Sequence, residues 1–105
     1  MADQLDDAFY QRADAHIHLS NDQLKEASRE GVNASLLFAA ARFSAFISAG
    51  GFASGEAMAA KKDETVEYFV AGFRQMLEAN LDAYINNFGS YVQGEDTRDD
   101  GATGR

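Results

Sequence analysis

Apolar residues recur at helical spacing in the first quarter of the chain. They follow one another at steps of four or seven residues: Leu5, Phe9, Ala13, Ile17 and Leu24. Such spacing places them on one face of a helix, which we expect from about Asp3 to about Ala27. Within it, Ser20-Asn21-Asp22-Gln23 has the form of a capping box, so we expect the helix to break and restart at Ser20.

The middle of the chain is apolar on all sides of a second expected helix. Residues 34–49 read ASLLFAAARFSAFISA, in which the polar residues are Ser35, Arg42, Ser44 and Ser48. A helix that is apolar all round is buried on most sides. Asn33 is a natural N-cap and Gly50-Gly51 a natural end, so we predict a short, buried central helix.

A third helix is predicted from a cap at Ser54 to about Phe88, and at about 34 residues it would be about 51 Å long. The central helix spans only about 24 Å and covers about half of it. The uncovered half carries four large apolar side chains: Leu81, Tyr84, Ile85 and Phe88. Soluble monomers rarely expose such a patch, so either the helix bends near Gly72 or a second copy covers it. We favour self-association, with a dimer as the first expectation.

The predicted fold class is therefore all-α: a three-helix, bundle-like domain with a short buried central helix, a long third helix and oligomeric assembly. The single domain spans residues 1–93. Residues 94–105, GEDTRDDGATGR, hold no large apolar side chain, and we expect them to form a disordered acidic tail.

The composition excludes several classes of site and partner. The 105 residues contain no proline or cysteine, and nine Lys and Arg stand against seventeen Asp and Glu, for a net charge of −8. Without cysteine there are no disulfides, thiolate metal sites or cysteine nucleophiles. An acidic surface repels nucleic acid and anionic lipid, so we expect neither as a partner. The acidic start has no secretion signal, and residues 34–49 fall short of the ~20 needed for a membrane span, so a cytoplasmic location is expected.

Three blocks of the sequence resemble a known family. They are FYQRAD at 9–14, FAAARFSAF at 38–46, and YF at 68–69 followed by FRQMLE at 73–78, together with Asn80-Leu81 and Tyr84-Ile85. They are similar to small bacterial proteins catalogued as a domain of unknown function, numbered 3144. The resemblance covers roughly residues 3–88. It implies a small bacterial helical protein and supplies no catalytic residue.

Four polar residues in apolar surroundings are the candidate functional side chains. Asp14 and His18 share a helix face, which is too little for a closed metal site and fits a solvated pair. His16 lies beside Ile17 and should be partly buried. It would then be either a neutral histidine hydrogen-bonded to a neighbouring group or a proton donor. Arg42, on a buried helix, requires a carboxylate such as Asp14 or Glu67, or else an anionic ligand. Asn80 interrupts the third helix's apolar stripe, where a buried asparagine fixes register.

No catalytic motif, phosphate-binding loop or cofactor site is found in the sequence. We therefore predict a non-enzymatic interaction or regulatory module that self-associates through Leu81, Tyr84, Ile85 and Phe88. The alternative is a ligand- or metal-binding helical bundle, with or without enzymatic activity, around Asp14, His16 and Arg42. A pocket lined by those three residues would favour the alternative.

Overall fold

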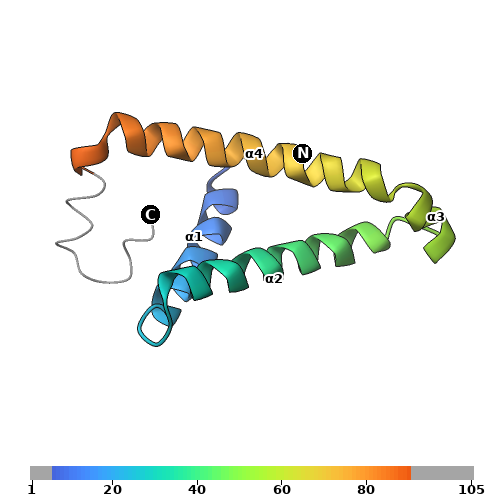
Figure 1. Ribbon diagram of the computed structural model, residues 1–105, viewed down its shortest axis with the longest axis horizontal. Helices are drawn as coiled ribbons and strands as arrows, with labels where there is room; N and C mark the ends of the chain where they lie inside the picture. The colour runs from blue at the N-terminus through green and yellow to red at the C-terminus, as the bar shows by residue number, and fades with distance from the viewer. Residues whose placement is uncertain (1–5, 91–105) are drawn as a thin grey trace. The chain divides into compact units, whose positions relative to one another are not determined.

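The computed structural model describes residues 6–90, and in that range the chain is helical apart from short connections. Four helices follow one another there (Figure 1): α1 (Asp7–Gln23), α2 (Arg29–Ala49), α3 (Gly55–Ala60) and α4 (Lys62–Asn86). No strand occurs among these residues. The predicted all-α class is confirmed, with four described helices in place of three. The predicted acidic tail lies outside the described residues.

An aspartate fixes the start of α1. Asp6 Oδ1 accepts a hydrogen bond from the Phe9 backbone N–H at 2.9 Å, which satisfies one of the free donors at the helix N-terminus. Phe9, Ala13 and Ile17 are half-buried, as the predicted stripe requires. The predicted restart at Ser20 is wrong. The Ser20 carbonyl accepts from the Leu24 N–H at 3.1 Å, so the backbone continues in helical bonding through Ser20.

A serine likewise fixes the start of α2. Ser28 Oγ accepts a hydrogen bond from the Gly31 N–H at 3.0 Å, and the helix begins at Arg29. The prediction that Asn33 caps this helix is therefore wrong. Serine caps as well as asparagine does, and a glycine in the first turn costs too little to delay the helix.

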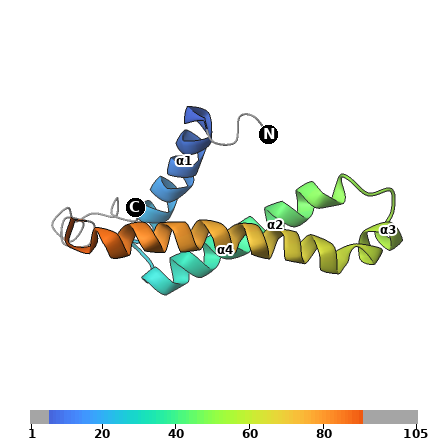
Figure 2. The same cartoon turned by 90° about the horizontal axis from the view of Figure 1, so that it is seen from above.

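The described residues fall into two compact units, and α2 contributes to both. The first holds α1, α2 up to Leu36 and the described residues from Phe88 onward, and the second runs from Leu37 to Asn87. In the second unit, α2 leads through Gly50-Gly51 into α3, after which α4 runs back in the opposite direction (Figure 2). Ser54 Oγ accepts from the Ala57 N–H at 3.1 Å, so the predicted cap at Ser54 is confirmed.

The predicted long third helix is divided. Lys61, with φ −109° and ψ 12°, separates α3 from α4. The break falls there rather than near Gly72, through which α4 is continuous. With 21 residues in α2 and 25 in α4, the two helices are about 31 and 37 Å long. The large difference in length that the sequence predicts is therefore absent.

Burial is the largest departure from the prediction. Among the described residues, Val32 at 6 % and Asn21 at 5 % exposure are the buried side chains. The central helix is thus neither short nor buried. Helices α3 and α4 are the closest-packed pair in the described part of the chain, and α2 and α4 contact each other little. The reason is geometric, since a helix that is apolar all round is buried only when other helices surround it.

Candidate interaction surface

Residues 37–86, here called the α2–α4 hairpin, carry many large apolar side chains that the fold leaves uncovered. Their exposed fractions run from 37 to 72 %: Leu37, Phe38, Phe43, Phe46, Ile47, Val66, Tyr68, Phe69, Val70, Phe73, Met76, Leu77, Leu81 and Ile85. With roughly 150–200 Å² for each side chain and about half of it exposed, about 1,100–1,500 Å² of apolar surface remains in contact with water. The largest apolar patch of a typical monomer is about 300–600 Å². These side chains lie on several faces of α2 and α4, and their summed exposed area exceeds that of one such patch.

Within α2, the cover that the hairpin provides falls on small residues. In α2 from Leu37 onward, Ser44 and Ser48 are half-buried, and every other side chain is exposed. In α4, a Cβ added to Gly72 would meet no atom within 4 Å, although that residue is half-buried. The phenylalanines of α2 consequently contribute little to the packing of their own chain.

One face of α4 carries a seam, which we define by six residues at alternating steps of four and three: Val66, Val70, Phe73, Leu77, Asn80 and Tyr84. This period of 3.5 residues is typical of helices that pair along their length. Asn80 lies among the apolar residues of the seam, as the sequence predicts. It is exposed, however, and its Nδ2 donates to the Met76 carbonyl at 2.8 Å. The prediction that Asn80 is buried is wrong for the single chain, because no other helix covers the seam there.

Arg42 lies between two phenylalanines on α2. Phe38, Arg42 and Phe46 follow at steps of four residues and share a face, here called the Phe38–Arg42–Phe46 stripe. The phenylalanines are 65 and 69 % exposed. Arg42 is exposed too, and the ion pairs among the described residues involve other side chains, Lys25 with Asp22 and Lys61 with Glu64. The predicted burial of Arg42 is therefore wrong, and an exposed guanidinium needs no carboxylate.

The predicted self-association residues lie at the distal end of α4 and just beyond it. Leu81, Ile85 and Phe88 are 51, 67 and 61 % exposed. Tyr84 is half-buried, and it takes part in an interaction within the chain. Three of the four side chains therefore remain free to contact another molecule.

The polar candidates on α1 differ in their surroundings. Asp14 is half-buried and takes part in an interaction. His16 and His18 are exposed, so the expected partial burial of His16 is wrong. The covered face of α1 follows Phe9, Ala13 and Ile17, and a residue adjacent to Ile17 in sequence lies about 100° around the helix from it. In the described part of the chain, no three histidine or acidic side chains lie close enough to hold a metal ion.

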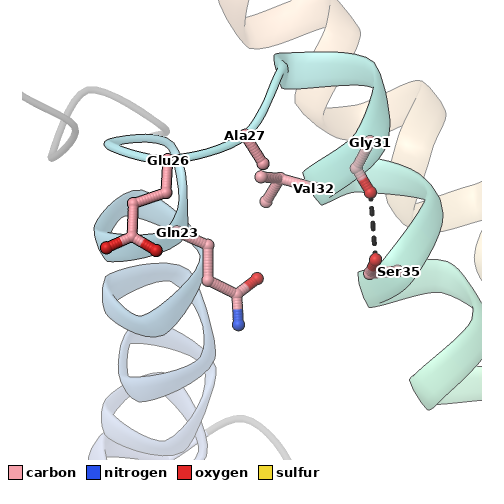
Figure 3. Close-up of a pocket in the computed structure, with 6 residues that line it drawn as sticks. All are labelled: Gln23, Glu26, Ala27, Gly31, Val32 and Ser35. Atoms are coloured by element: carbon pink, nitrogen blue, oxygen red, sulfur yellow. Dashed lines mark hydrogen bonds between the residues drawn. The ribbon is translucent and has the colours of Figure 1, made fainter.

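Asp14 and His16 belong to the first unit and Arg42 to the second. A shallow pocket of about 340 Å³ lies elsewhere, where the end of α1, the connection and the start of α2 meet (Figure 3). Its lining residues are Gln23, Glu26, Ala27, Gly31, Val32 and Ser35. Glu26 is the single carboxylate in this lining, and without a basic side chain beside it the pocket holds no acid–base pair. No pattern in the sequence predicted this pocket.

The observed length of α2 changes one more expectation. Counted from Arg29, the helix has 21 residues and is long and apolar enough to cross a membrane by length and composition. The argument that this segment is too short for a span is therefore wrong, because it began the helix at Ala34. Arg42 still lies within the span.

The fold defines the class of this protein: in the described residues it is all-helical, with an extended apolar surface. A family model described as a protein of unknown function (DUF3144) matches residues 9–85, and the chain belongs to that family. This confirms the resemblance seen in the sequence blocks. Among curated proteins and among solved structures, no significant match to the chain is found.

Proposed function

We propose that this protein is a non-enzymatic, self-associating interaction module of the cytoplasm. In this proposal two copies cover the apolar surface of the α2–α4 hairpin apart from Tyr68, which shares the polar face of α4. The covered part includes Leu81 and Ile85 at the distal end of α4. The three-helix bundle expected from the sequence would then be a property of the assembly rather than of one chain.

The observation that carries the proposal is the exposed area. A stable interface of standard size removes about 800 Å² from each partner, and the hairpin offers about 1,100–1,500 Å² of exposed apolar surface. Burial of apolar surface is the main favourable contribution to association. A chain with so little buried apolar surface of its own gains much of its stability by associating.

Native mass spectrometry of the untagged protein, prepared without chelator, tests the proposal. It measures the number of subunits and any retained metal or small molecule in the same spectrum. A dimer or larger assembly without added mass supports the interaction module. A monomer refutes it, and extra mass on each subunit favours the competing ligand- or metal-binding bundle.

A further inference from the structure

We infer that two copies exchange their α2 helices: the Phe38–Arg42–Phe46 stripe of each copy packs on the α4 seam of the other. Arg42 then pairs with a carboxylate beside that seam. This inference rests on the proposed self-association and specifies which surfaces meet.

Apolar residues lie on more than one face of α2. The Phe38–Arg42–Phe46 stripe lies roughly 140° around the helix from the face that holds Leu37, Ser44 and Ser48. One neighbouring helix cannot cover both faces. Since Ser44 and Ser48 are the half-buried positions and α2 contacts α4 of its own chain little, the stripe is the side left for a partner.

The two surfaces fit each other in length. The stripe from Phe38 to Phe46 is about 12 Å long, and the seam from Val66 to Tyr84 is about 27 Å long. The seam is therefore long enough to receive the whole stripe. Reciprocal docking uses both surfaces twice, as a symmetric dimer requires, and covers phenylalanines and seam residues that one chain leaves exposed.

The stripe and the edge of the α4 seam carry charges that can pair. Glu67 and Glu78 each follow a seam residue directly, Val66 and Leu77, so both lie along one edge of the seam. Arg74, which follows Phe73, lies on the same edge, so this edge carries two carboxylates and one guanidinium. Arg42 lies at the centre of the stripe and has no ion pair with the described residues. An arginine that becomes covered by a partner needs a carboxylate, and the edge of the seam supplies one.

Arg42 also favours a second copy of the chain over lipid as the partner that covers this face of α2. In a bilayer, Arg42 would lie within the α2 span without a carboxylate, a costly arrangement. The chain's net charge of −8 also opposes approach to an anionic membrane.

Two aromatic truncations test the docking of the stripe. Phe46 and Tyr68 are 69 and 72 % exposed, and Tyr68 shares the polar face of α4 with Gln75 and Asp82. By sedimentation equilibrium, Phe46→Ala should raise the dimer dissociation constant at least about 30-fold, and the matched control Tyr68→Ala less than about threefold. Equal effects of the two truncations would overturn the inference. Circular dichroism checks that helix content is retained.

Charge reversal tests the ion pair. Arg42→Glu should weaken the dimer, while Arg29→Glu, with the same change in net charge, should weaken it much less. Adding Glu67→Arg or Glu78→Arg to Arg42→Glu should restore association and identify the partner carboxylate. Failure of both double variants to restore it would overturn the pairing.

Wild-type behaviour separates this inference from the proposed function. A monomeric wild type that does not bind vesicles refutes both. A monomer that floats with phosphatidylcholine vesicles also refutes both and assigns lipid as the occupant of α2. A dimer weakened by Ile85→Ala but unaffected by Phe46→Ala and Arg42→Glu refutes the exchange of α2 and leaves self-association standing.

Discussion

Truncation of Ile85 to alanine probes the distal end of α4, where sequence and structure point to the same side chains. Ile85 is 67 % exposed, and Leu81, one turn earlier, is 51 % exposed. Because most of the Ile85 side chain contacts nothing in its own chain, its truncation should leave helix content unchanged. The effect should fall on association.

The magnitude follows from the exposed fraction. Complete burial of an isoleucine side chain contributes about 1.5–3 kcal/mol. A second copy can bury at most the two thirds that remains exposed, which is worth about 1–2 kcal/mol for each copy. A symmetric dimer loses this twice, about 2–4 kcal/mol, and the dissociation constant rises roughly 30- to 1,000-fold.

Sedimentation equilibrium on the wild type, Ile85→Ala and Tyr68→Ala measures this change directly. Tyr68→Ala removes a larger exposed side chain from the polar face of α4 and serves as the control. A dissociation constant for Ile85→Ala within threefold of the wild-type value would refute the assignment of the distal helix to the interface. Loss of helix content would instead show that Ile85 is held within its own chain.

Three further predictions concern single side chains. Phe88→Asp should dissociate the dimer in size-exclusion chromatography with light scattering, because Phe88 is 61 % exposed and a covered, unpaired carboxylate is costly; an unchanged dimer excludes Phe88 from the interface. Ser28→Ala should lower the free energy of unfolding by about 1 kcal/mol in urea titration, since Ser28 Oγ accepts from the Gly31 N–H; no change would show that the cap is unimportant. Gly72→Ala should raise the thermal midpoint, with a gain of about 0.5–1 kcal/mol, because the added Cβ meets no atom within 4 Å; a lower midpoint would show that another helix packs at Gly72.

Local features of the fold could be predicted from the sequence. Ser54 caps α3, Gly50-Gly51 follows the end of α2, and Phe9, Ala13 and Ile17 form the covered face of α1. Each depends on residues within about four positions along the chain, the range of helical hydrogen bonds and capping contacts. The start of α2 was not predicted correctly, because the sequence indicated Asn33 as its cap and Ser28 caps it instead.

The candidate site was harder to predict, because burial was inferred from apolarity. The sequence correctly identified Leu81, Ile85 and Phe88 as large apolar side chains near the end of the third helix. It placed His16, Arg42 and Asn80 in buried surroundings, and all three are exposed. An apolar helix indicates that something must cover it, but it does not indicate whether the cover comes from the same chain.

The sequence by itself determined that this protein is helical, where α2 ends and α3 begins, and which faces of the helices are apolar. These properties follow from backbone hydrogen bonding, capping and side-chain spacing, all of which act over a few residues. Only the tertiary structure decided that α2 and α4 leave those faces exposed, with Arg42 and Asn80 among them. Exposure depends on where the other helices lie, and that is set by the connections at Gly50-Gly51 and Lys61 rather than by the helices themselves.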